Sequence, residues 1–138
     1  MVGSVDERGR YLVDVTDNAL KMGISVCGPG VAFKEIGDAI ENYVNDVGLK
    51  VIPDFIGHGI GRFFHGAPQI CHYRNKYPGN MLAGMTFTIE PIVCLGSPRI
   101  KILEDDWTAV TKDNSRSAQF EHTILITHDG VEVLTLPD

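Results

Sequence analysis

The sequence predicts an α+β fold in which two helices pack on an antiparallel sheet. In the first third of the chain, apolar residues recur at three- and four-residue steps, which is the period of an amphipathic helix. In the second half they recur at every second residue, which is the period of a strand. Helices followed by a run of strands are typical of this class, whereas a parallel sheet needs helices and strands in alternation.

Two helices are expected, one from Asp6 to Met22 and one from about Phe33 to Val47. The turn residues at 27–30 follow the first pattern, and Gly48 ends the second. Their apolar faces consist of Tyr11, Leu12, Val15, Ala19, Leu20 and Met22, and of Phe33, Ile36, Ile40, Tyr43, Val44 and Val47.

The strands follow from alternation and from turn residues. A short strand is expected at Lys50 to Ile52. Residues 57–84 are rich in glycine, proline and aromatic residues, which favours loops around short strands and makes this segment the expected place for a site. Further strands are expected at 85–90, 107–110, 120–127 and 131–135.

Composition limits the class of protein. The 138 residues, 43% of them hydrophobic, suit a single domain, residues 1–138. A net charge of -6 with scattered Lys and Arg argues against nucleic acid, and no apolar run is long enough to predict a membrane partner. Cys27, Cys71 and Cys94 have neither a CxxC nor a zinc spacing, which predicts reduced thiols and a cytoplasmic location, with an organelle as the alternative.

His58 stands between Gly57 and Gly59, with a second histidine, His65, seven residues later. A lone histidine is more often structural. Flanking glycines let backbone or substrate approach closely and permit unusual dihedral angles. The pattern therefore favours a ligand or catalytic role for His58.

Two carboxylates complete the candidate set. Around Glu90, alternation places Thr86, Thr88 and Glu90 on one face, although a solvated edge strand ending at Pro91 would look the same. Gln119, Glu121 and Thr123 share one face of the next strand, so Glu121 and His122 cannot bind one metal from a regular strand. We choose Glu121, because a carboxylate amid apolar residues needs a partner.

Other polar and aromatic features have simpler interpretations. The acidic run from Glu104 to Asp106 is typical of a solvated turn, and we assign it no ligand role. Phe64 and Trp107 would suit an apolar substrate pocket, but taken alone both are expected in the core.

Several motifs occur together in one order and spacing. They are Gly57-His58-Gly59-Ile60-Gly61, Phe64-His65, Ala67-Pro68, Thr88-Ile89-Glu90-Pro91, Asp106-Trp107-Thr108 and the run from Ser117 to Thr123. Together they resemble type I methionine aminopeptidases. The match begins near Val2 and covers only the C-terminal half of that family's pita-bread (creatinase/aminopeptidase) fold, in which two related halves enclose the active site.

The resemblance implies a role for each candidate residue. His58, Glu90 and Glu121 would bind metal, with Glu121 bridging in a two-metal site. Glu90 would also act as general base, and His65 would hydrogen-bond the scissile amide. These roles suit metal-assisted hydrolysis of a peptide bond.

The resemblance also implies the substrate and the cofactor. Phe64 and Trp107 would contact the methionine side chain at the N-terminus of a peptide or nascent protein. The cofactors would be divalent metal ions, Co, Mn, Fe or Zn. A complete family site holds two, but the aspartate ligands of the other half have no counterpart here. We therefore expect at most one metal and little or no activity of this chain alone.

Two other interpretations stay open. The chain could be a catalytically dead binding module with the same fold, or its histidines and glutamates could form a polar core without metal, with Glu90 and Glu121 protonated or hydrogen-bonded. In either case an isolated half exposes apolar surface, so we expect a homodimer in which a second copy covers the missing half.

Overall fold

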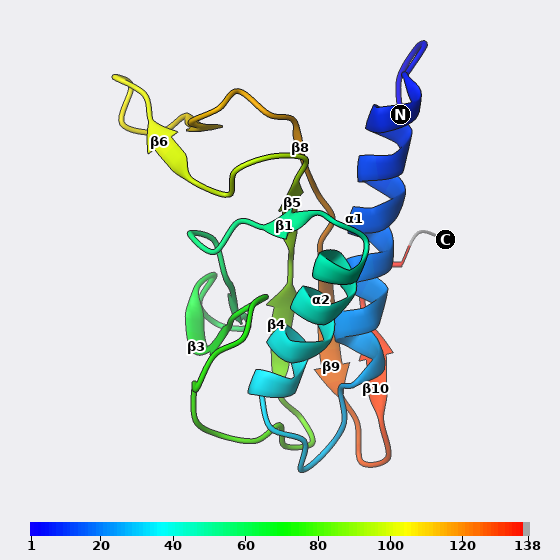
Figure 1. Ribbon diagram of the computed structural model, residues 1–138. Helices are drawn as coiled ribbons and strands as arrows, with labels where there is room; N and C mark the ends of the chain where they lie inside the picture. Colours follow the sequence, from blue (N-terminus) through cyan, green and yellow to red (C-terminus); the bar gives the residue numbers. More distant parts are fainter. Residues whose placement is uncertain (137–138) are drawn as a thin grey trace.

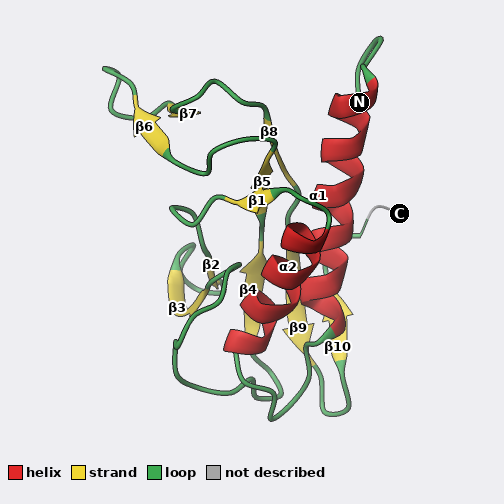
Figure 2. Ribbon diagram, viewed as in Figure 1, coloured by secondary structure: helices red, strands yellow, loops and turns green. Residues whose placement is uncertain are grey.

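Two helices lie side by side across one face of an antiparallel sheet (Figures 1 and 2). This computed structural model describes residues 1–136. Helix α1 (Glu7–Ser25) begins where Asp6 accepts a hydrogen bond from the Gly9 backbone at 2.7 Å. Helix α2 (Lys34–Asp46) ends before Gly48, whose φ of 79° suits a residue without a β-carbon. Both predicted helices are confirmed, and α1 extends beyond its expected end at Met22.

The main sheet has five strands in the order β10-β9-β4-β2-β3, all antiparallel to their neighbours. A smaller sheet has the order β1-β5-β8, and β6 and β7 form a separate hairpin. The helices and strands together confirm the predicted α+β class. The strands are β1 (Lys50–Val51), β2 (Gly57–Gly59), β3 (Gly66–Ile70), β4 (Thr86–Ile89), β5 (Ile92–Cys94), β6 (Ile100–Ile102), β7 (Ala109–Thr111), β8 (Ser117–Gln119), β9 (His122–Ile126) and β10 (Val131–Val133).

Three strand predictions need correction. The strand expected at 120–127 starts later, because β9 begins at His122 and ends at Ile126, and the preceding strand β8 has no counterpart in the prediction. The expected strand that begins at Met85 starts instead at Thr86 and stops before Glu90 and Pro91, where proline cannot donate to a ladder. The strand expected from Trp107 begins at Ala109, and its partner β6 has no counterpart in the prediction.

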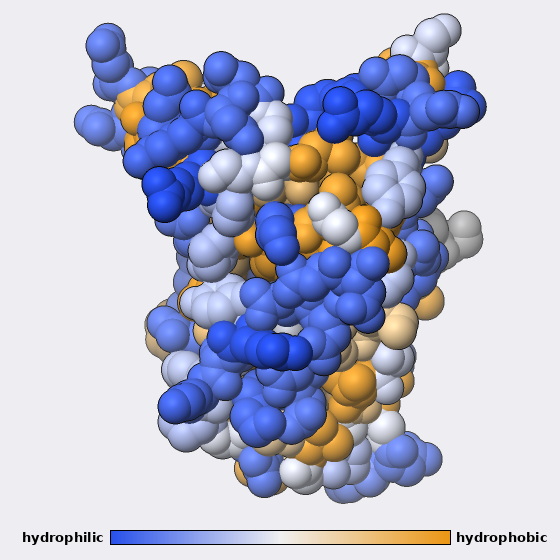
Figure 3. All heavy atoms as spheres, in the orientation of Figure 1, coloured by the Kyte–Doolittle hydropathy of each residue, from blue (hydrophilic) through white to orange (hydrophobic). Residues whose placement is uncertain are grey.

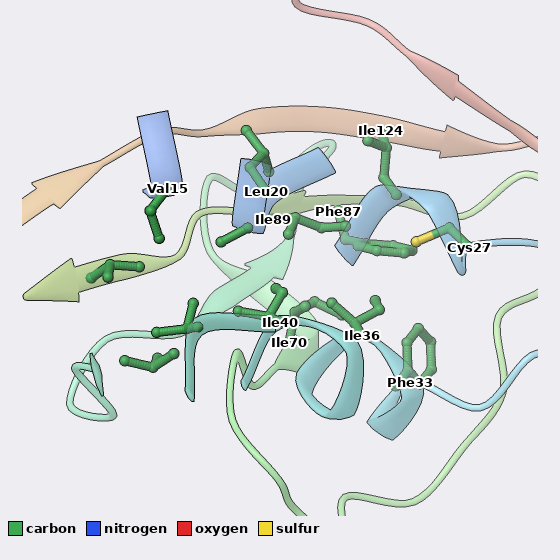
Figure 4. Close-up of a cluster of buried hydrophobic side chains, with 14 of the residues drawn as sticks. Val15, Leu20, Cys27, Phe33, Ile36, Ile40, Ile70, Phe87, Ile89 and Ile124 are labelled. Atoms are coloured by element: carbon green, nitrogen blue, oxygen red, sulfur yellow. The ribbon is translucent and has the colours of Figure 1, made fainter. Parts of the chain in front are cut away.

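The core fills the space between the helices and the main sheet. Leu20, Ile36 and Ile40 from the helices meet Phe87 and Ile89 from β4, and all five side chains are at most 1% exposed (Figure 4). This packing fixes which face of β4 meets the helices, so the alternate residues of that strand point to the face away from the helices. Tyr11 and Met22, predicted on the apolar face of α1, are instead exposed.

The surface is hollowed between the projecting β6–β7 hairpin and the N-terminal end of α1, and apolar residues gather in that hollow (Figure 3). Several large apolar side chains elsewhere on the molecule are also exposed, among them Phe63, Phe64, Leu82 and Trp107. Within residues 1–136, no helix is both long enough and apolar enough to cross a membrane.

Candidate metal centre

The glycines on either side of His58 are required by close backbone contacts. A β-carbon on Gly57 would lie 2.2 Å from the carbonyl oxygen of Thr88, and one on Gly59 would lie 1.9 Å from that of Ala67. Neither glycine has a positive φ, so the expected unusual dihedral angles are not the reason. Strand β2 therefore lies tightly between β3 and β4, which fixes the backbone of His58.

The two ring nitrogens of His58 have different partners. Nδ1 lies 3.1 Å from the carbonyl oxygen of Gly59, and Nε2 lies 3.5 Å from Oε1 of Glu90. When Nδ1–H donates a hydrogen bond to the Gly59 carbonyl oxygen, the neutral ring keeps a lone pair on Nε2, on the side of Glu90. Both side chains are 15% exposed. His58 is thus oriented as a metal-binding histidine would be.

Thr88 connects the backbone of His58 to the carboxylate of Glu90. Its hydroxyl accepts a hydrogen bond from the His58 backbone at 3.0 Å and donates one to Glu90 Oε1 at 2.7 Å. Thr88 is 1% exposed and projects from the face of β4 opposite to Phe87 and Ile89, where its hydroxyl meets the carboxylate of Glu90, the residue that follows β4. The predicted polar face is therefore present, with Thr88 buried and Thr86 and Glu90 partly buried.

Glu90 and Glu121 lie opposite each other. Between β4 and β5 the regular pairing is interrupted. Ile89 pairs with His122 before the interruption and Ile92 pairs with Gln119 after it, so both registers place Glu90 across from Glu121. The side-chain amide of Gln119 lies 3.4 Å from Glu90 Oε2. Opposed residues on antiparallel strands are close enough to interact, and like charges there are destabilising.

The surroundings of Glu90 change its acidity in both directions. Burial has the largest effect and raises the pKa of Glu90 above its ordinary value. The charge of Glu121 also raises the pKa, whereas the Thr88 hydroxyl and the imidazoles of His58 and His65 lower it. A carboxylate with a raised pKa is a better proton acceptor, which suits the general base predicted at this position.

A buried histidine, His72, contacts the backbone of Glu90 from the protein interior. His72 is fully buried, and its Nε2 accepts a hydrogen bond from the Glu90 backbone at 3.1 Å. Burial lowers the pKa of His72 to about 4, although the backbone of Phe55 acts against this shift. His72 is therefore neutral at physiological pH.

His65 and Phe64 lie beside His58 in an aromatic cluster. The ring centroid of His65 is 4.3 Å from that of His58 and 4.6 Å from that of Phe64. His58 and His65 line an open hollow of about 490 Å³ that continues along β3 to Tyr77. This hollow provides room for a ligand next to the imidazoles.

The expectation that Phe64 and Trp107 belong to the core is wrong. Phe64 is 72% exposed and Trp107 is 88% exposed. Trp107 stands in the turn between β6 and β7, where Asp105 accepts hydrogen bonds from the backbones of Trp107 and Thr108. The acidic run is thus a solvated turn, as predicted. The hairpin that carries Trp107 extends away from the main sheet (Figure 2).

Residues 1–128 match the model of a protein family described as metallopeptidase family M24. The chain belongs to this family. It is 52% identical to mitochondrial methionine aminopeptidase 1D of Danio rerio, and the alignment covers 100% of this chain but 41% of the relative. The M24 region found here therefore spans less than half of that curated relative.

Solved structures give the same assignment. Methionine aminopeptidase from Rickettsia prowazekii superimposes with a TM-score of 0.94 at 42% identity, over 98% of this chain and 55% of that chain. A prolidase from Pyrococcus horikoshii matches with a TM-score of 0.74 at 24% identity, which indicates the fold alone. The architecture of this M24 chain is accordingly that of part of the pita-bread fold, as predicted.

An M24 metallopeptidase requires a metal ion, and the donor chemistry of the candidate site agrees. Imidazole and carboxylate donors suit divalent transition metals, and a cation would relieve the repulsion between Glu90 and Glu121. The three predicted ligands are nevertheless not preassembled. In residues 1–136, no three His, Cys, Asp or Glu side chains lie close enough together to hold a metal ion. The structure brings His58 and Glu90 together and leaves Glu121 exposed opposite them.

Two residues of the candidate site could not be recognised from the motifs. Thr88 was recognised only as part of a polar face, although its hydroxyl joins two predicted ligands. His72 was not considered at all. The available signal was its position directly after the apolar pair Ile70 and Cys71, where a histidine needs a hydrogen-bond partner.

Proposed function

We propose that this chain is the C-terminal half of a metal-dependent aminopeptidase that removes methionine from the N-terminus of nascent proteins and peptides. The observation that carries the proposal is the arrangement of Glu90, opposite Glu121 and 3.5 Å from Nε2 of His58. Two opposed carboxylates repel each other, and a cation held between them and the imidazole would offset this repulsion.

His58, Glu90 and Glu121 would hold the metal ion, for which Mn, Fe, Co or Zn is suitable. When bound, such an ion polarises a carbonyl and lowers the pKa of a water molecule. Glu90 would accept the proton that the attacking water loses, because burial makes its carboxylate more basic. The strand register places Glu121 opposite Glu90, so rotation of the Glu121 side chain toward Glu90 would bring the third ligand into the set.

The neighbouring aromatic side chains suit the substrate. His65 lies 4.3 Å from His58 between ring centroids and would hydrogen-bond the scissile amide. Phe64 and Trp107 would contact the methionine side chain of the substrate. Their exposure supports this role, because apolar rings that are not part of the core remain available to a ligand.

We further propose that the chain alone binds at most one metal and has little or no peptidase activity. It corresponds to 41% of the Danio rerio relative, and positioning of the substrate contributes several orders of magnitude to a rate in favourable cases. The specific observation that favours a catalytically dead binding module as second candidate is the incomplete ligand cluster. Metal binding decides between the two candidates.

A homodimer is the assembly we propose for the isolated chain. Phe63, Phe64 and Trp107 are each more than 70% exposed, and burial of such surface drives association. Sedimentation velocity over a range of concentrations tests this proposal, and a strict monomer at the highest concentration would contradict it. The three cysteines are free and buried. They support a reducing compartment, for which we propose the cytoplasm, with an organelle as the alternative suggested by the mitochondrial relative.

The experiment that tests the function is calorimetric titration of the purified chain with Mn(II) and Co(II), run beside a methionyl-peptide hydrolysis assay. One site in the wild type, lost in Glu90→Gln and Glu121→Gln but kept in Glu104→Gln, is the expected result. The last variant removes a carboxylate of the solvated acidic run and serves as the matched control. Absence of binding would favour the dead module, whereas two sites with turnover would contradict the proposed limit of one metal.

A further inference from the structure

Glu90 lies at a point where the regular ladder of the sheet is interrupted. It follows β4, which ends at Ile89, and precedes Pro91 and β5, which begins at Ile92. The backbone N–H of Glu90 is therefore outside both named strands, and it donates instead to Nε2 of His72 at 3.1 Å. At Glu90, the predicted general base, the imidazole of His72 thus replaces the backbone carbonyl that a strand residue would have as its hydrogen-bond acceptor.

His72 reaches this point from the end of a different strand. It follows β3, which is not adjacent to β4 in the sheet, and its imidazole is fully buried. Because Nε2 accepts the hydrogen bond from the Glu90 N–H, Nε2 itself carries no proton and the neutral ring has its proton on Nδ1. Nδ1 is buried and has no hydrogen bond of ordinary geometry within residues 1–136. The backbone of Phe55 also interacts with this ring and opposes the lowering of its pKa by burial, but the bond to Glu90 is the ring's one hydrogen bond of ordinary geometry within residues 1–136.

We propose that His72 is a positioning residue, which fixes the backbone of Glu90 so that its carboxylate meets Thr88 and Nε2 of His58. This inference rests on the proposed function, in which Glu90 is a metal ligand and general base. The backbone of Glu90 is held by His72 from the interior, and its carboxylate is held by the Thr88 hydroxyl at 2.7 Å on the other side. Two separate restraints therefore define where the carboxylate oxygens lie.

The competing explanation is that His72 only stabilises the fold. Two substitutions distinguish this structural role from the positioning role. In His72→Gln, the side-chain amide reaches the position of Nε2 and can accept the Glu90 N–H. In His72→Asn, the amide reaches only the position of Nδ1 and cannot. Both variants bury a polar amide in the place of the imidazole, so both should lose stability of the fold. Only His72→Gln keeps an acceptor for the Glu90 N–H.

The measurement is Mn(II) affinity of the full chain by calorimetry, with thermal unfolding recorded for each variant. Loss of an outer partner of a metal ligand commonly weakens metal binding about 10- to 100-fold, and we expect a loss of this size in His72→Asn and its recovery in His72→Gln. Equal affinity in the wild type and in both variants would overturn the role of His72 and leave the proposed function intact. No Mn(II) binding by the wild type would overturn both.

The hydrogen bond between His72 and Glu90 can also be tested by NMR on the wild-type chain, without any variant. The nitrogen chemical shifts of His72 report which ring nitrogen carries the proton, and amide hydrogen exchange reports whether the Glu90 N–H is bonded. We expect a proton on Nδ1 and a slowly exchanging Glu90 amide. A proton on Nε2, or rapid exchange at Glu90, would overturn the inference whatever the metal affinity.

Discussion

The hydroxyl of Thr88 donates a hydrogen bond to Oε1 of Glu90 at 2.7 Å and at the same time accepts one from the backbone of His58 at 3.0 Å. One buried side chain thereby links two strands and two predicted metal ligands. Because a hydroxyl has one proton to donate, its donation to Glu90 leaves its lone pairs for the His58 N–H. The positions of the two ligands are coupled through this single group.

Replacement of Thr88 by valine should weaken both the fold and the metal site. Valine has a similar shape but no hydroxyl, so the His58 N–H would lose its partner, at a cost of about 1–3 kcal/mol in the free energy of unfolding. We expect Mn(II) affinity to fall about 10- to 100-fold, the usual effect of removing an outer partner of a ligand. Thr88→Ser keeps the hydroxyl and should restore most of the affinity. Urea denaturation and calorimetry measure the two effects, and equal affinity in the valine and serine variants would contradict the coupling.

The glycines of the His58 motif should differ sharply in their tolerance of alanine. A β-carbon at Gly59 would lie 1.9 Å from the Ala67 carbonyl, whereas one at Gly61 would meet no atom within 4 Å. Overpacking against backbone costs at least about 1–3 kcal/mol, so Gly59→Ala should be strongly destabilised. Gly61→Ala should change the free energy of unfolding by less than about 0.5 kcal/mol. Urea denaturation compares the two variants directly, and similar stabilities would show that β2 can move away from β3.

The helices were the most predictable part of the fold, because local periodicity determines which face of a helix is buried. Leu12, Val15, Ala19 and Leu20 were expected on the buried face of α1, and all four are at most 3% exposed. The exact ends of the strands were less predictable. Continuous alternation from Phe120 to Thr127 hid the break before His122, because the break depends on the opposed break at Glu90 and Pro91.

Long-range contacts explain what sequence reasoning missed at the site. Trp107 was expected in the core because the single tryptophan of a small domain is usually buried, but its hairpin projects from the body and the residue is 88% exposed. His72 was overlooked because its partner, the Glu90 backbone, lies on a strand that is not adjacent to β3. Motif spacing predicted roles for His58 and Glu90, whereas the side chains that contact them, Thr88 and His72, are recognised only once the strands are paired.

Cys27 should be unreactive while the chain is folded. Cys27 is 9% exposed, its thiol lies 3.3 Å from the Gly23 carbonyl oxygen, and burial raises the pKa of this thiol to about 12. Since the thiolate is the reactive form, a thiol reagent near neutral pH should modify Cys27 only through unfolding. Mass spectrometry after brief alkylation, with and without denaturant, measures this. Rapid modification of Cys27 in the native chain would contradict the burial of the segment that follows α1.

The pair formed by Asp6 and Arg116 should make stability depend on pH in the acidic range. Arg116 donates to both carboxylate oxygens of Asp6, at 2.9 and 3.2 Å, and Asp6 also accepts the Gly9 N–H at the start of α1. The hydrogen bond from Arg116 is the largest of the effects that lower the pKa of Asp6 below its ordinary value of 3.8. The folded chain therefore releases this proton more readily than the unfolded chain does.

It follows that the contribution of Asp6 to stability is present above pH 3.8 and disappears as the pH falls through the lower folded pKa. Asp6→Asn keeps an oxygen that can cap α1 but has no carboxyl group to titrate. The difference in the free energy of unfolding between the wild type and Asp6→Asn should thus shrink on acidification, as measured by urea denaturation at a series of pH values. Arg116→Gln should remove most of this dependence, because it removes the main cause of the lowered pKa. A difference that stays constant down to the lowest pH would mean that Asp6 acts only as a helix cap, without the ion pair that ties α1 to the strand β8.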